Sequence, residues 1–231
     1  PQKSSSELDE LEQQLANFFK RWQQRLRRKK RSLKYVSLRV KQLQEELQSI
    51  SEDELTTAID ELRDQLYHQG LGDESLILQA FATIREASAR SLGKSHFDVQ
   101  LYGGWLMING MLAEMETGEG KTLTMTLPAC TAALAGIPVH VITANDYLAA
   151  RDSELMQPLY KRLGLSTASV IDGMDTGQRQ RAYQADIVHT TNQQIAFDYL
   201  RDRLLLGNNR SQLRLQLESA YADTHRRGQF L

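Results

Sequence analysis

The sequence predicts an α/β fold, in which a parallel sheet carries helices on both faces and follows an α-helical amino-terminal extension. Three observations predict this fold. Residues 7–69 contain neither Gly nor Pro, which favours helix throughout. Beyond residue 120, short β-branched segments alternate with helix-like segments, as is typical of parallel sheets. Between the two parts lies a Gly-x-Gly-Lys-Thr sequence at residues 118–122.

Length and composition limit the class of protein. The chain has 231 residues, enough for one sizeable core and an appendage. Its formal net charge of −1 gives no overall attraction to nucleic acid or to a membrane. The single cysteine, Cys130, excludes an intrachain disulfide and fits a reducing compartment, so we expect a cytoplasmic location. No apolar run approaches the roughly 20 residues of a membrane-spanning helix.

Residues 1–72 are predicted to form the helical extension. Apolar side chains recur at helical spacing in its first part, at Leu8, Leu11, Leu15, Phe18, Phe19 and Trp22. Ser51, followed three residues later by Glu54, is a capping box that predicts the start of a helix. Gly70 is expected to end that helix.

A basic run lies at residues 25–31, and no acidic residue occurs between Glu12 and Glu45. With the aromatic side chains just before the run, the stretch 18–41 could lie on anionic lipid, at about 1 kcal/mol per basic residue near the surface. The alternative is a solvated helical face or a disordered arm.

A phosphate-binding loop is predicted at Gly118, Glu119, Gly120, Lys121 and Thr122. The two glycines let the main chain pass close to an anion, so that successive N–H groups can point at it. Lys121 would place its ammonium beside the β- and γ-phosphates of ATP, and the Thr122 hydroxyl would complete a Mg²⁺ shell. A helix is expected over residues 123–134, with its N-terminus facing the phosphates.

The residues before the loop add to this interpretation. Residues 107–115 are apolar enough to form a buried strand that leads into the loop, although the full loop pattern expects Gly at Met115. Gln100 lies 18 residues before Gly118, and its amide could read the adenine ring and select ATP over GTP. His96 has no second ligand at metal spacing, so no metal role is expected.

Residues 73–206 are predicted to form a first nucleotide-binding lobe. Its strands are expected at residues 139–143, 166–171 and 186–190. Its other helices are expected at residues 73–93, from Asn145 or Asp146 to about Leu163, at residues 177–183 and at residues 192–206. Residues 207–231 are expected to be a tail leading toward a missing part of the lobe. There the alternation of Leu213, Leu215 and Leu217 leaves helix and strand open.

A site that hydrolyses ATP also needs a strand ending in Asp-Glu, in which Asp holds Mg²⁺ through water and Glu activates the attacking water. Pairs at residues 9–10, 53–54 and 73–74 precede the loop, and no such pair follows Lys121. We therefore expect an amino-terminal piece of a longer protein, with no catalytic residue of its own.

Four motifs resemble those of SecA, the ATPase motor of bacterial preprotein translocation. Residues 115–122 resemble its phosphate loop, in which Met also replaces the usual first Gly. Residues 96–101 are similar to its adenine-reading Q motif, and residues 139–152 and 190–202 resemble two further helicase-type motifs. The resemblance covers about residues 35–205.

The resemblance implies a two-lobed, P-loop helicase-like motor of the DEAD type. Such a motor couples ATP hydrolysis to moving unfolded preproteins through a membrane channel, and it lies peripherally on the cytoplasmic membrane. This chain would be most of the first lobe. Gln100 would read adenine, residues 118–122 would hold the phosphates, and Thr122 would bind Mg²⁺. Residues 1 to about 30 and 207–231 have no close counterpart, which indicates a divergent branch.

Two other classes stay open at this point. The basic residues between Lys20 and Lys41 are compatible with a DEAD-type nucleic-acid helicase lobe, although binding of nucleic acid is not expected. The chain could also be a non-catalytic ATP-binding module whose first 70 residues dock on a membrane or a partner.

Overall fold

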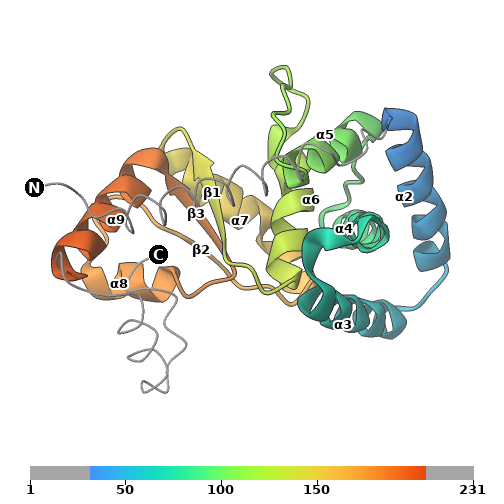
Figure 1. Ribbon diagram of the computed structural model, residues 1–231, viewed down its shortest axis with the longest axis horizontal. Coiled ribbons are helices and arrows are strands. Elements are labelled where there is room, and N and C mark those ends of the chain that lie inside the picture. Colours follow the sequence, from blue (N-terminus) through green and yellow to red (C-terminus); the bar gives the residue numbers. More distant parts are fainter. Residues whose placement is uncertain (1–31, 207–231) are drawn as a thin grey trace, which may run out of the picture.

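The computed structural model describes residues 32–206 (Figure 1). The expectations for residues 1–31, which include the basic run and the apolar face before it, lie outside the described residues, as do those for the tail at residues 207–231. Within the described part, helices form one end of the molecule, and a parallel sheet with its own helices forms the other. The predicted α/β class is confirmed.

The helical end consists of α2 (Leu33–Gln48), α3 (Glu52–Gln69), η1 (Gly70–Gly72), α4 (Glu74–Leu92) and α5 (Asp98–Ile108). The predicted capping box is confirmed, because Ser51 Oγ accepts from the Glu54 N–H at 3.3 Å and Glu54 Oε2 accepts from the Ser51 N–H at 2.7 Å. Gly93 follows α4 with a left-handed φ of 64°, which Gly adopts without steric cost. No helix within residues 32–206 combines the length and hydropathy that a membrane crossing requires.

The sheet contains β1 (Val139–Thr143), β2 (Thr167–Ser169) and β3 (Ile187–Thr191), with α6 (Lys121–Leu134), α7 (Asp146–Arg162), α8 (Thr176–Ala182) and α9 (Asn192–Leu206) around it. The strands are parallel in the order β1-β3-β2, and Val139 lies opposite Ile187 in the register. In Figure 1, α6 and α7 lie between the sheet and the helical end, whereas α8 and α9 lie on the other side of the sheet. The elements predicted after residue 138 are confirmed to within a few residues.

One hydrophobic core joins the helical end to the sheet. Phe81 of α4, Leu127 of α6, Tyr160 of α7 and Ile187 of β3 are fully buried members of the same cluster. Burial of each such side chain stabilises the fold by about 1.5–3 kcal/mol, so the two ends stabilise each other. A smaller cluster packs α8 on the sheet, at Val170, Ala182, Tyr183 and Val188. The predicted boundary at residue 72 stays a prediction.

The strand predicted at residues 107–115 is wrong. Helix α5 continues through Ile108, and residues 111–116 are irregular, with Leu112 93% exposed. A strand needs a neighbouring strand to satisfy its main-chain hydrogen bonds. None of the three strands within residues 32–206 pairs with this segment.

Gly103 and Gly104 lie inside α5. A Cβ on Gly104 would lie 2.9 Å from the Cβ of Leu127, and a Cβ on Gly103 would lie 3.0 Å from a methyl carbon of Thr124. These positions therefore let α5 pack closely on α6, which places the start of α5 beside the predicted phosphate-binding loop.

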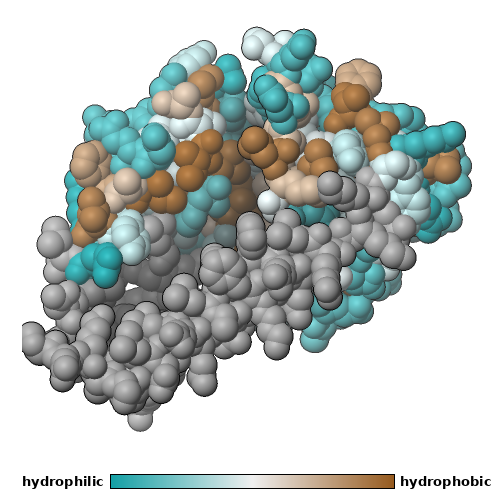
Figure 2. All heavy atoms as spheres, turned by 45° about the horizontal axis from the view of Figure 1, so that its top comes forward, coloured by the Kyte–Doolittle hydropathy of each residue, from teal (hydrophilic) through white to brown (hydrophobic). Residues whose placement is uncertain are grey.

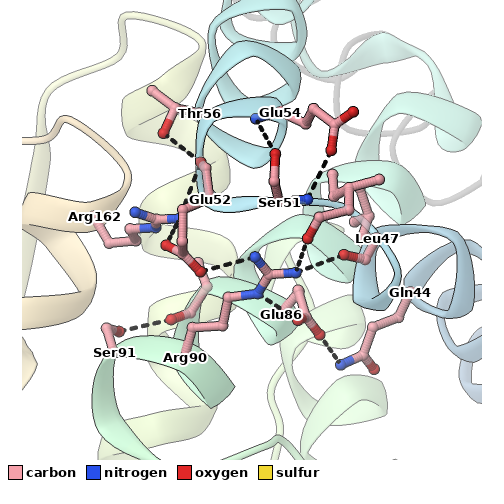
Figure 3. Close-up of polar contacts among 12 residues, drawn as sticks. Gln44, Leu47, Ser51, Glu52, Glu54, Thr56, Glu86, Arg90, Ser91 and Arg162 are labelled. Carbon is pink, nitrogen blue, oxygen red and sulfur yellow. Dashed lines mark hydrogen bonds and ion pairs between the residues drawn. The ribbon is translucent and has the colours of Figure 1, made fainter.

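A charged network links α4 to both α3 and α7 (Figure 3). Arg90 of α4 donates to Glu86 at 2.8 Å and to Glu52 at 2.9 Å, and also to two main-chain carbonyls at and just after the end of α2. Glu52 pairs in addition with Arg162 of α7. The first residue of α3 is therefore tied to helices from both ends of the molecule.

Replacing Glu52 by Gln is expected to lower the free energy of unfolding by about 1 kcal/mol, and by less at high salt, because its ion pairs are partly exposed. Urea unfolding at low and high salt measures this loss. Asp53→Asn is the matched control, since Asp53 lies in the same helical turn and experiences the same helix dipole, but forms no salt bridge within residues 32–206. Equal losses in both variants would show that the Glu52 pairs contribute nothing.

Candidate nucleotide-binding site

The predicted phosphate-binding loop connects α5 to α6. Gly118 and Gly120 have φ angles of 93° and 78°, which Gly adopts far more readily than other residues. Gly120 is the N-cap of α6, so the N–H groups of Lys121 and Thr122 begin the helix without an intrahelical acceptor. A helix end of this kind favours a bound anion.

The charged side chains of Lys121 and Glu119 form hydrogen bonds within the loop. Lys121 Nζ donates to the carbonyl oxygen of Glu116 at 2.7 Å, and Glu119 Oε2 accepts from the N–H of Glu116 at 2.8 Å. Both bonds connect the end of the loop to its start. The ammonium of Lys121 is therefore folded back over the loop.

The Thr122 hydroxyl faces α7. Its Oγ1 lies 3.4 Å from Oδ2 of Asp152, whose Oδ1 accepts from Nε and Nη2 of Arg151 at 3.0 and 2.6 Å. Asp152 is the last residue of the helicase-type motif at residues 139–152, but the sequence predicts no role for it in the site. Its position beside Thr122 depends on the packing of α7 near α6, which spacing along the chain does not reveal.

Gln100 reaches the loop, but its amide is bonded within the chain. Its Oε1 accepts from the Phe97 N–H at 2.9 Å, and its Nε2 donates to the carbonyl oxygen of Glu119 at 2.7 Å. A Cβ on Gly120 would lie 2.4 Å from this Nε2, so Gly120 leaves the room that Gln100 occupies. Gln100 supports the loop here, and its reading of adenine stays a prediction.

A cavity of about 770 Å³ lies beside the loop, and its polar lining includes Gln100, Glu119 and Thr122 with the main chain of Gly118 and Gly120. Its apolar wall includes Phe97, Val99 and Leu155, which are 72%, 54% and 46% exposed. An apolar wall with a few polar groups is typical of a small-molecule site. Figure 2 shows hydrophobic side chains gathered around a hollow on one face of the molecule.

A second cavity, of about 610 Å³, lies at the carboxyl ends of β1 and β3, and its lining includes Asn145, Tyr147, Asn192 and Phe197. Arg179 also lines it, but its charge is neutralised by Asp198 at 2.9 Å, and both side chains are buried. The sequence does not predict this cavity, because its walls come from segments that are distant in the chain.

His96 is a buried part of the packing between the start of α5 and α6. Its Nε2 lies 3.0 Å from the carbonyl oxygen of Leu123 and 3.1 Å from Oγ1 of Thr126. Burial lowers the pKa of His96 to about 4, so the ring is neutral at pH 7. Among residues 32–206, no three His, Cys, Asp or Glu side chains are grouped to hold a metal ion.

Comparison with known proteins finds a matching family model and similar curated proteins. A model described as "SecA DEAD-like domain" matches residues 16–223. The chain is 55% identical, over 159 residues, to "Protein translocase subunit SecA 2" of Bordetella avium (strain 197N), which covers 69% of this chain and 24% of that protein. It is 50% identical, over 172 residues, to "Protein translocase subunit SecA 3" of Magnetococcus marinus (strain ATCC BAA-1437 / JCM 17883 / MC-1), which covers 74% of this chain and 26% of that protein. The chain thus spans about a quarter of the length of these two relatives.

Proposed function

Because this chain belongs to the SecA family, we propose that it is the ATP-binding lobe of a SecA-like motor, which couples ATP hydrolysis to preprotein translocation across a membrane. One observation carries the proposal. Gln100 and residues of the loop at 118–122 converge on a single cavity, although Gln100 lies 18 residues before Gly118.

The residues present fit ATP and Mg²⁺. The N–H groups of Lys121 and Thr122, together with the Lys121 ammonium, would bind the phosphates. The Thr122 hydroxyl would supply one of the oxygen ligands that Mg²⁺ prefers, and Mg²⁺ would neutralise charge on the phosphates. Phe97 and Val99 would offer an apolar surface to the adenine ring, and Gln100 would read its edge.

We expect the chain on its own to bind ATP without hydrolysing it. Hydrolysis requires a carboxylate that positions or activates the attacking water, and no adjacent Asp-Glu pair follows Lys121. In the full-length protein, that pair and a second lobe would complete the ATPase.

The relatives are named as protein translocase subunits. For the full-length protein, we propose that the partners are an unfolded preprotein and a membrane channel, at the cytoplasmic face of the membrane. Contact of residues 18–41 with anionic lipid belongs to this proposal. Nucleic acid does not, because a net charge of −1 gives the chain no general attraction to a polyanion.

Replacing Lys121 by Ala is expected to weaken ATP binding about 10- to 100-fold, because a charged hydrogen bond of about 1.5–3 kcal/mol is lost. Titration of the purified chain with a fluorescent ATP analogue and Mg²⁺ measures the affinity. Lys161→Ala, at the end of α7, controls for the loss of one positive charge.

Two outcomes would contradict the proposal in different ways. Unchanged affinity in Lys121→Ala would show that the loop is not the phosphate site. Turnover of ATP by the unmodified chain that disappears in Lys121→Ala would show a complete catalytic site, and would overturn the expectation of an inactive lobe.

A further inference from the structure

Asp152 presents one carboxylate oxygen to the phosphate-binding loop. The residue lies in α7 and is 6% exposed. Its Oδ1 accepts both hydrogen bonds from Arg151, whereas its Oδ2 lies 3.4 Å from the hydroxyl oxygen of Thr122. The two oxygens therefore have different partners: Oδ1 faces the Arg151 guanidinium, and Oδ2 faces the loop.

This arrangement determines how the Thr122 hydroxyl can point. A hydroxyl group carries one proton and two lone pairs, and an ionised carboxylate can only accept. The proton of Thr122 is therefore directed toward Asp152, and the lone pairs are directed away from α7. A metal ligand must present a lone pair to the metal, so this orientation prepares Thr122 for a cation on the loop side.

The burial of a carboxylate at this position also needs an explanation. Removing a charged group from water costs free energy unless the group is hydrogen-bonded. Arg151 is about half exposed, and such a pair contributes little stability. An apolar side chain would fill the same space without the desolvation cost, which argues for a role that requires an acceptor.

We propose that Asp152 is a positioning residue, which holds the Thr122 hydroxyl so that its oxygen faces the Mg²⁺ of a bound nucleotide. The inference rests on the proposed ATP site. Residues that orient a metal ligand in this way typically change metal affinity 10- to 100-fold when they are replaced.

The test is the Mg²⁺ dependence of nucleotide binding in Asp152→Asn. This substitution keeps the shape of the side chain. If Arg151 retains the amide oxygen, the NH₂ group faces Thr122 and reverses the direction of the hydrogen bond. We expect affinity for a fluorescent ATP analogue to fall at least tenfold with Mg²⁺, and to stay unchanged in EDTA. Asp64→Asn, on the exposed face of α3, is the control for charge.

A double substitution separates a positioning role from a structural one. If Asp152 acts through Thr122, Asp152→Asn should have no further effect in a Thr122→Ala background. Equal weakening with Mg²⁺ and in EDTA, additive effects of the two substitutions, or no effect of Asp152→Asn would each overturn the inference. Circular dichroism and the melting temperature confirm that each variant is folded.

Lys121→Ala distinguishes failure of this inference from failure of the proposed function. Suppose that Lys121→Ala weakens ATP binding, whereas Asp152→Asn leaves the Mg²⁺ dependence of that binding unchanged. The ATP site is then supported, and the positioning role of Asp152 is refuted. If the unmodified chain binds no ATP at millimolar ligand, the proposed function and the positioning role of Asp152 are both refuted.

Discussion

Replacing Asp198 by Ala is expected to lower the free energy of unfolding by about 3–5 kcal/mol, the cost of leaving a buried charge without its partner. Asp198 is fully buried and Arg179 is 4% exposed. One oxygen of Asp198 accepts from both Arg179 Nη1 and the Tyr183 hydroxyl at 2.9 Å. Without the carboxylate, the Arg179 guanidinium would remain in a low-dielectric site, where its remaining acceptors within residues 32–206 are the main-chain carbonyl oxygens of Ile171 and Met174. Urea unfolding measures the loss.

A neighbouring arginine provides the control for this experiment. Arg201 also donates to Asp198, at 3.2 Å, but its side chain is 59% exposed, so Arg201→Ala should cost less than about 1 kcal/mol. The double variant Arg179→Met with Asp198→Leu should recover part of the stability lost in Asp198→Ala, because no buried charge is left. If Asp198→Ala lowers the free energy of unfolding no more than Arg201→Ala does, burial of the Arg179–Asp198 pair does not determine the cost of breaking it.

Acid is expected to destabilise the chain as the pH falls from about 6.5 to about 4, by up to about 3 kcal/mol for each of two buried histidines. Burial lowers the pKa of His96 and that of His189 to about 4, whereas the unfolded chain takes up protons near 6.5. Between these values the unfolded state binds more protons than the folded state. The stability is therefore fully present above about pH 6.5, and it is lost as the pH falls toward 4.

Urea unfolding at a series of pH values measures this dependence. His189, whose ring meets the hydroxyl of Tyr160 at 3.1 Å, can be replaced by Gln to keep a polar group there. The variant should be less stable at pH 7 but lose less stability between pH 6.5 and 4. His68→Gln, at an exposed position of α3, is the matched control for the substitution itself. If the free energy of unfolding depends on pH identically in His189→Gln and in the unmodified chain, His189 does not contribute to the loss of stability in acid.

The elements that the sequence predicts correctly are those that local chemistry determines. The capping box of Ser51 and Glu54 is complete within four residues, and Asn145 caps α7 by accepting from the Leu148 N–H at 2.9 Å. The strand at Val139–Thr143 is rich in β-branched residues. Each of these signals acts over a few residues, so it is visible in the sequence.

The features that the sequence misses depend on contacts between distant segments. Residues 107–115 have the composition of a strand, but a strand forms only where another strand can pair with it. Gly104 has a low helix propensity. It nevertheless lies in α5, where the absence of a side chain allows close packing on α6. The role proposed for Asp152 and the ion pair of Asp198 both depend on burial, which spacing along the chain does not show.

The bond between the Lys121 ammonium and the Glu116 carbonyl has an energetic consequence. If Lys121 turns its ammonium toward the phosphates of the proposed site, it gives up the Glu116 carbonyl, so the loop would act as an intramolecular competitor of the ligand. The measured affinity would then reflect an exchange of partners rather than the whole strength of the new contact. A single phosphate or a sulfate would make fewer contacts along the loop than a triphosphate, so the competition would favour the longer polyphosphate.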